Sequence, residues 1–275
     1  MNLTQLKRAQ REAESAARAA GALMRRNLTA SKKRNEETQH DIKLELDVRC
    51  QKLIEASLHK AYPEIALLGE EGVTGDAAAA YRWVVDPIDG TVNFAYGLPH
   101  ACVSIALQGP MKVRDPRRGT LPGADYVTLL GVVYDPFLDE MWTAIKGQPA
   151  MLNGKRIRVS DRSKLEEAIV AIGFSKTKAS LDATLPSFNR LIYRVRKTRM
   201  LGAAALSLTW TAAGRMDAFV ETGIRIWDIA AGGLILESAG GDFWHRPVQG
   251  EHRYMMIANN GKLTTKLKRY LPRKI

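Results

Sequence analysis

The chain has 275 residues and carries 41 Lys and Arg against 29 Asp and Glu, a formal net charge of +12. Its 45% hydrophobic and 25% charged residues are typical of a globular protein and exclude a disordered, collagenous or disulfide-stapled chain. The two cysteines, Cys50 and Cys102, are too few for a disulfide framework, and they predict buried thiols in a reducing compartment.

The first 26 residues carry charges throughout and contain no apolar core, so they do not resemble a secretory signal. The longest uncharged apolar run, 201–214, is shorter than the roughly 20 residues that a membrane helix needs. We therefore expect a soluble, cytoplasmic protein that does not act in a membrane.

Apolar residues at helical spacing predict an amphipathic helix over residues 3–28. A second helix is expected to open at Asp47 and to end before Pro63. Short apolar runs predict strands at 42–46, 65–68, 82–85, 102–107 and 129–134. The segment 112–125 is rich in Gly, Pro and Arg, which predicts a hairpin excursion between the last two strands.

The second half of the chain continues the alternation of strands and helices. Strands are expected at 157–160, 169–174 and 217–221, and helices at 203–213 and 229–239. Ser163, with Glu166 three residues later, predicts a further helix start through a capping box. This alternation predicts a layered α/β or α+β protein, with an N-terminal half (1–140) and a C-terminal half (141–275) in one compact catalytic unit.

Acidic residues stand where the predicted strands and helices meet. Glu70 and Glu71 follow one predicted strand, Asp86 and Asp89 follow the next, and Asp228 opens a helix far downstream. Neighbouring strands lie about 4.8 Å apart, so these side chains can converge on one point. Carboxylates that close together repel one another unless a cation lies among them, and oxygen ligands favour hard cations such as Mg²⁺.

The glycine and threonine after Asp89 add a possible phosphate site. Gly90 allows close approach of the backbone to an anion, and a helix that starts near Thr91 would point its free N–H groups at a phosphate. No P-loop occurs, and two residues separate Asp86 from Asp89 where aspartyl-phosphate enzymes have one. We therefore expect a water nucleophile, with two cations to activate it and to stabilise the leaving oxygen.

These motifs resemble those of a known family. Residues 83–94, WVVDPIDGTVNF, resemble the first signature of the inositol monophosphatase family, and residues 227–233, WDIAAGG, resemble its second. Matching segments at 69–71, 131–134 and 153–154 follow the family's order, so the resemblance covers nearly the whole chain. It implies an αβαβα sandwich (the sugar phosphatase fold), a homodimer, and Mg²⁺-dependent, lithium-sensitive hydrolysis of phosphate monoesters such as inositol monophosphate.

The resemblance also implies a role for each matching residue. The first of two or three Mg²⁺ ions would be held by Glu70, Asp86 and the carbonyl of Ile88, and the second by Asp86, Asp89 and Asp228. The catalytic residues that handle the attacking water would be Asp47, Thr91 and Glu70. The phosphate would lie on the N–H groups of Gly90 and Thr91, with Asp89 as a further substrate contact. The alcohol portion of the substrate would contact Glu221 and the stretch Gly202, Ala203 and Ala204.

Departures from the family pattern keep the substrate open. Ala203 replaces a common Ser or Thr, and Arg225 offers a cation for a second phosphate or carboxylate. Fructose 1,6-bisphosphate and histidinol phosphate are therefore alternative substrates. A different class, a basic nucleic-acid-binding protein, would use the +12 surface, including 112–125 and the basic C-terminal tail, but no stacking motif or known nucleic-acid module supports it.

Overall fold

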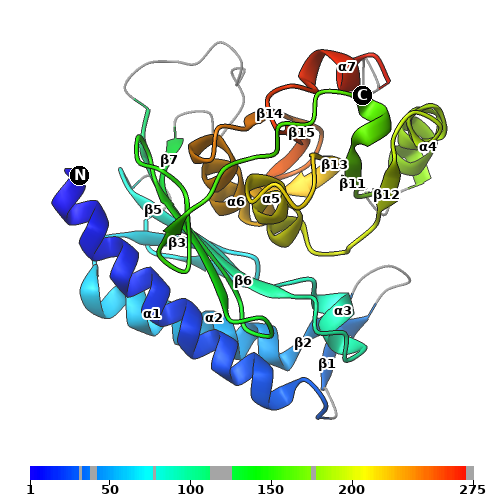
Figure 1. Ribbon diagram of the computed structural model, residues 1–275. Helices are drawn as coiled ribbons and strands as arrows, with labels where there is room; N and C mark the ends of the chain where they lie inside the picture. The colour runs from blue at the N-terminus through cyan, green and yellow to red at the C-terminus, as the bar shows by residue number, and fades with distance from the viewer. Residues whose placement is uncertain (31–32, 38–41, 77–78, 112–125, 175–177, 271–275) are drawn as a thin grey trace.

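The computed structural model describes residues 1–30, 33–37, 42–76, 79–111, 126–174 and 178–270. The helices and sheets stack in five layers, helix on sheet on helix on sheet on helix (Figure 1). The expected αβαβα sandwich is confirmed. Within the described part of the chain, no helix has the length and the apolar composition that crossing a bilayer requires.

Two helices form the first layer. α1 (Leu3–Asn27) buries a stripe of small residues, including Ala9 and Ala13, against the large sheet. α2 (Glu45–Ala61) follows a small two-stranded sheet, β1 (Arg34–Glu37) with β2 (Ile42–Leu44). α2 starts two residues before the expected Asp47. The carboxylate of Asp47 accepts the N–H of Leu44 at 2.7 Å, so Asp47 closes the first helical turn and does not open it.

The second layer is an eight-stranded sheet with the order β10-β9-β8-β7-β6-β5-β3-β4. Its strands are β3 (Ala66–Gly69), β4 (Gly72–Thr74), β5 (Arg82–Asp89), β6 (Cys102–Pro110), β7 (Tyr126–Asp135), β8 (Glu140–Ile145), β9 (Met151–Leu152) and β10 (Lys155–Arg156). The four strands expected from 65 to 134 are neighbours in it. β3 and β5 run parallel, whereas β6 and β7 are antiparallel. The segment 112–125 lies outside the described residues.

The third layer lies between the two sheets and contains α5 (Ala204–Ala212) and α6 (Ile226–Ser238) (Figure 1). Both helices were expected from their composition, and α6 starts three residues earlier than predicted. α6 contacts β6 and β7 of the large sheet and β14 of the small one. The close fit depends on Gly131 of β7, where an added Cβ would lie 2.7 Å from the carbonyl oxygen of Ala231.

The fourth layer is a five-stranded sheet with the order β12-β11-β13-β15-β14, and α4 (Lys178–Ile192) and α7 (Thr264–Lys268) cover its outer face. The strands are β11 (Ile169–Ile172), β12 (Lys197–Arg199), β13 (Ala218–Arg225), β14 (Asp242–Pro247) and β15 (Arg253–Asn259). β11 and β13 match strands predicted from the sequence, whereas β12, β14, β15 and the helix α4 were not predicted.

Two predictions for the segment that connects the large sheet to the small one were wrong. Residues 157–160 form no strand, and only a short 3-10 turn, Leu165–Glu167, follows Ser163. The buried carboxylate of Asp217 accepts hydrogen bonds from Arg162 at 2.7 Å and from the N–H of Ile169 at 2.8 Å. These long-range bonds hold the segment in an irregular path. The division of the chain at residue 140 stays a prediction; the large sheet takes its strands from as far along the chain as Arg156.

Candidate metal and phosphate site

Asp86 and Asp89 lie in the last part of β5, where the strand bulges. Asp86 stands opposite Ser104 of β6 and Asp89 opposite Cys102, so three steps on β5 match two on β6. Side chains alternate along a regular strand, and one extra residue therefore brings two positions three apart onto the same face. Pro87 has no N–H to offer to the pairing, which favours the bulge at this point.

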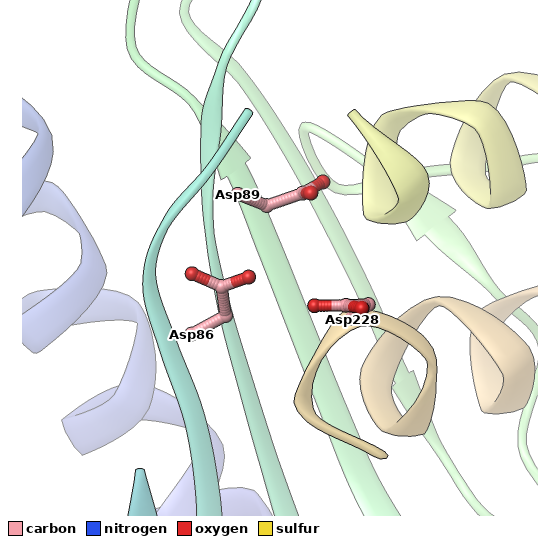
Figure 2. Close-up of side chains that lie close together, drawn as sticks. All are labelled: Asp86, Asp89 and Asp228. Carbon is pink, nitrogen blue, oxygen red and sulfur yellow. The ribbon is translucent and has the colours of Figure 1, made fainter. Parts of the chain in front are cut away.

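Asp228 reaches the same place from α6. It is the third residue of the helix, and its Oδ2 accepts the N–H of Arg225 at 2.9 Å. The hydroxyl of Ser104 donates to the carbonyl of Trp227 at 3.0 Å and so fastens the start of α6 to β6. One carboxylate oxygen from each of Asp86, Asp89 and Asp228 lies within 4.8 Å of the others (Figure 2).

Burial raises the pKa of all three carboxyl groups, and repulsion between carboxylates raises it further at Asp86 and Asp228. The pKa of Asp86 lies well above its ordinary value because of burial first and the charges of Glu70 and Asp89 next. Burial raises the pKa of Asp89 to about 6 and that of Asp228 to about 7. A cation would remove this repulsion, and a set of oxygen donors alone is the kind that Mg²⁺ prefers. The three residues therefore fit a Mg²⁺ site.

The start of α5 holds Asp89 in place. The N–H of Ala204 donates to Oδ1 of Asp89 at 3.0 Å, and the N–H of Ala205 donates to Oδ2 at 2.7 Å. These are the first two residues of α5, whose N–H groups have no partner within the helix. The thiol of Cys102 lies 3.5 Å from Oδ2. The expected substrate contact Ala204 thus uses its N–H to orient Asp89, and the neighbouring Ala203 is buried.

The turn after Asp89 is tight and left-handed. Gly90 adopts a left-handed φ of +88°, and an added Cβ would lie 2.9 Å from the carbonyl oxygen of His100. α3 (Thr91–Ala95) begins directly after it. The hydroxyl of Thr91 donates to the carbonyl of Ile88 at 2.9 Å, and the N–H of Ile88 donates to Asp86 at 3.0 Å. The turn is therefore held by its own hydrogen bonds.

Asn93 joins this turn to the loop before α5. Its side-chain N–H groups donate to the carbonyls of His100 at 2.9 Å and Leu201 at 2.8 Å. Gly202 lies beside the amide, where an added Cβ would approach its Nδ2 to 3.2 Å. Asn93 lies within the segment 83–94 that carries the first signature, but no role was predicted for it. Its partner Leu201 is 108 positions away, and no local pattern reveals such a contact.

Glu70 and Asp47 belong to the same group of charges, because both raise the pKa of Asp86. Glu70 follows β3, and its N–H donates to the carbonyl of Val85 at 3.2 Å. Gln51 of α2, which the sequence analysis missed, holds the adjoining turn: its Oε1 accepts the N–H of Glu71 at 3.0 Å. α2 therefore carries a group that acts on the site, Asp47, and the side chain that fixes the Glu70 turn.

The last two expected substrate contacts, Glu221 and Arg225, both lie on β13. The carboxylate of Glu221 lies against Gly173, where an added Cβ would be only 1.8 Å from its Oε2. The guanidinium of Arg225 lies 5.5 Å from the ring of Trp227 and donates from Nη1 to the carbonyl of Glu251 at 2.5 Å. The charge of Arg225 lowers the pKa of Asp228, so this cation lies near the three aspartates.

The sequence and the fold have known relatives. Residues 5–274 match the model of the inositol monophosphatase family. The chain is 40% identical over 235 residues to inositol monophosphatase 2 of Solanum lycopersicum, over 82% of this chain and 83% of that protein. It is 39% identical over 276 residues to Nus factor SuhB of Pseudomonas aeruginosa, over 94% of each. The crystal structure of extragenic suppressor protein SuhB from Bartonella henselae matches with a TM-score of 0.84 and 32% identity, over 96% of this chain and 98% of that chain.

Proposed function

The chain belongs to the inositol monophosphatase family, and we propose that it hydrolyses a phosphate monoester with Mg²⁺, with inositol monophosphate as the first candidate substrate. One observation carries this proposal. Carboxylate oxygens of Asp86, Asp89 and Asp228 lie within 4.8 Å of one another beside the left-handed turn at Gly90. A cation site next to a turn that can bind an anion is the arrangement that metal-dependent phosphate chemistry requires.

The oxygen-rich surroundings fit two or three Mg²⁺ ions. We assign the first to Glu70, Asp86 and the carbonyl of Ile88. We assign the second to Asp86, Asp89 and Asp228. When bound, the cations supply positive charge that lowers the pKa of water and neutralises the phosphoryl and leaving oxygens.

The residues around the turn would orient the reactants. The hydroxyl hydrogen of Thr91 is directed at the carbonyl of Ile88, which leaves its oxygen as an acceptor for the attacking water. Asp47, buried on α2 and assisted by Glu70, would take the proton from this water. The N–H groups of Gly90 and Thr91 would hold the phosphate oxygens.

The test of the reaction is phosphate release from inositol 1-phosphate, fructose 1,6-bisphosphate and histidinol phosphate. Each substrate is measured with Mg²⁺, with a chelator, and with Mg²⁺ plus Li⁺. Release that the chelator abolishes and Li⁺ inhibits would support the proposal, and the preferred substrate would decide among the three. A folded protein that releases phosphate from none of them in Mg²⁺ would overturn it.

A second candidate function, nucleic-acid association, is favoured by the +12 charge and by the match to a protein named a Nus factor. Part of the basic C-terminal run is already engaged within the fold: Lys262 pairs with Asp161 at 2.8 Å, and Lys268 lies over the ring of Trp244. Residues 112–125 and 271–275 lie outside the described residues. RNA binding whose affinity falls steeply between low and physiological salt would support this second function.

We also propose that the protein forms a homodimer in the cytoplasm. Three large apolar side chains are exposed near the site: Tyr96 (67%), Leu98 (53%) and Met200 (66%). They stand on the two loops that Asn93 joins. Exposed apolar side chains close to one another are typical of protein interfaces. Sedimentation analysis at micromolar concentration, with Leu98→Glu as the disrupting variant, tests the proposal.

A further inference from the structure

Basic side chains gather beside the start of α6. β13 ends at Arg225 and β15 begins at Arg253, and these two residues stand opposite each other in the antiparallel pair. His252 precedes Arg253, and its ring lies 6.1 Å from the ring of Trp227. We call Arg225, His252 and Arg253 the basic cluster. Only the pairing of two strands brings its members together, because the two arginines are 28 positions apart in the sequence.

The arginines of the basic cluster have neutral partners. Nη1 of Arg225 donates to the carbonyl of Glu251 at 2.5 Å, and Nη1 of Arg253 donates to the carbonyl of Gly223 at 3.3 Å. Among the described residues, neither guanidinium makes an ion pair with a carboxylate. His252 is within 3.6 Å of the carboxylate of Glu251, whose side chain is 85% exposed. Each arginine therefore keeps N–H groups for another acceptor.

The positive charges of the basic cluster are energetically unfavourable without an anion, because the cluster is partly buried. Arg225, His252 and Arg253 are all partly buried. Burial lowers the pKa of Arg253, and the nearby charge of Arg225 lowers it further. Like charges in a partly desolvated position repel strongly, and an anion between them would reverse the sign of the interaction. Guanidinium groups are suited to this task because they can hold phosphate through two parallel hydrogen bonds.

The basic cluster adjoins the site of the aspartates. Arg225 donates its backbone N–H to Asp228, and its side chain lies over Trp227, the residue before Asp228. We propose that Arg225 and Arg253, with His252 beside them, bind a second phosphate group of the substrate. The inference rests on the proposed phosphatase function and, among its candidate substrates, favours a bisphosphorylated compound such as fructose 1,6-bisphosphate over a monophosphate. From the sequence, such a role was expected for Arg225 alone; Arg253 is the new member.

The first test measures binding without catalysis. The melting temperature is recorded in a chelator, with and without fructose 1,6-bisphosphate or fructose 6-phosphate. We expect the bisphosphate to stabilise the protein more than the monophosphate does. Arg253→Gln and Arg225→Gln should each remove this difference, whereas Arg156→Gln, at an exposed position of β10, should keep it. Each variant's melting temperature without ligand shows whether it is folded.

The second test measures selectivity in Mg²⁺. The ratio of kcat/KM for fructose 1,6-bisphosphate to that for inositol 1-phosphate should fall by about tenfold or more in Arg253→Gln, since a hydrogen bond between charged groups has about that effect. Arg253→Lys should recover part of the ratio. If no substrate is turned over, the phosphatase function fails, and the binding test still decides the basic cluster. Equal behaviour of Arg253→Gln and Arg156→Gln in the binding test would overturn the inference.

Discussion

The carboxylate of Asp89 makes two kinds of contact. It accepts the N–H groups of Ala204 and Ala205, and it lies within 4.8 Å of the oxygens of Asp86 and Asp228. The helix N–H groups favour the charged form, yet burial outweighs them and raises the pKa to about 6. A buried acid that is fixed in direction but costly to ionise is well prepared to receive a cation.

Replacement of this acid should separate activity from stability. We expect Asp89→Asn to lower Mg²⁺-dependent phosphate release by at least about a hundredfold, because a charged metal ligand is lost. In a chelator, the variant should stay folded, because relief of the repulsion on Asp86 and Asp228 offsets the loss of one of the two helix N–H bonds, for which an amide has only one acceptor oxygen. Phosphate assays and calorimetry check the two parts. Asp182→Asn, at an exposed acid paired with Lys178, is the matched control, and near-normal activity of Asp89→Asn would refute the assignment.

The raised pKa values predict how stability depends on pH. A carboxyl group whose pKa rises on folding binds protons more tightly in the folded state. Its contribution to the free energy of unfolding of the metal-free protein is therefore complete below about pH 4 and is lost as the pH rises through about 6 for Asp89 and about 7 for Asp228. Mg²⁺ competes with these protons, so the increase in melting temperature that it causes should grow from pH 5 to pH 8.

Calorimetry at pH 5, 6, 7 and 8, with Mg²⁺ or with a chelator, measures this dependence. Ligands that bind only the folded state stabilise it by mass action, so the shift reports the affinity at each pH. The same shift at every pH would show that the three carboxyl groups do not bind the ion. In Asp89→Asn the dependence should be weaker, because one of the competing protons is gone.

At the scale of elements, the bulge in β5 and the turn after it determine the geometry of the site. The extra residue between Asp86 and Asp89 places both carboxylates on the same face of the strand, and the next residue, Gly90, turns the chain into α3 through a left-handed conformation. Asn93 then fixes the turn against the loop that leads into α5. One short segment therefore aligns a strand end and two helix starts around one point.

Gly90→Ala should test this turn. At Gly90 a methyl group would meet both an unfavourable left-handed φ and the carbonyl oxygen of His100 at 2.9 Å. Gly147 has a similar φ of +80°, but an added Cβ would have no neighbour within 4 Å. We expect Gly147→Ala to destabilise the protein by about 1 kcal/mol, from backbone strain alone. Gly90→Ala should cost about 1–3 kcal/mol more and lower the affinity for phosphate.

Urea unfolding and phosphate binding measure the difference between the two glycine variants. Equal loss of stability in both would show that the turn can move away from His100. Normal phosphate binding by a folded Gly90→Ala protein would argue against the turn as the phosphate site.

At the scale of the whole molecule, α6 connects the two sheets and carries Asp228 to β5. Its position depends on the approach of Gly131 to Ala231, where no side chain separates strand from helix. Ser104 of β6 stands opposite Asp86 of β5, and its hydroxyl donates to the carbonyl of Trp227 at the start of α6. Both side chains therefore lie on the face of the large sheet that α6 covers. The distance between the layers therefore sets the distance between the carboxylates.

Gly131→Ala should move α6 away from the large sheet. We expect a loss of about 1–3 kcal/mol from overpacking, together with weaker Mg²⁺ binding because Asp228 moves with the helix. Val132→Ala is the matched control, since the next residue faces the α1 side of the same strand. It should cost about 1–3 kcal/mol through a cavity and leave the affinity for Mg²⁺ unchanged. Titration calorimetry with Mg²⁺ distinguishes the two, and equal affinities would mean that the layer spacing does not control the site.

The sequence by itself determined the local parts of this protein. Apolar patterns predicted the helices α1, α2, α5 and α6 and the strands β3, β5, β6, β7, β11 and β13, but not α4 or β15. The segment around Asp86, Asp89 and Gly90 supplied acids, a turn and a helix start within a few residues. Boundaries shifted where a side chain capped a helix, as Asp47 does. The strand at 157–160 and the helix start at Ser163 were wrongly predicted, because the path of this segment depends on hydrogen bonds to the distant Asp217.

Only the tertiary structure decided which of these parts meet. The bonds from α5 to Asp89, from Asn93 to Leu201 and from Ser104 to Trp227 each cross more than 100 positions of the chain. The approach of Arg253 to Arg225 likewise depends on the pairing of β13 with β15. Local propensity fixes whether a segment is a helix or a strand, but neighbours are chosen by the packing of whole layers, and the site lies where those layers join.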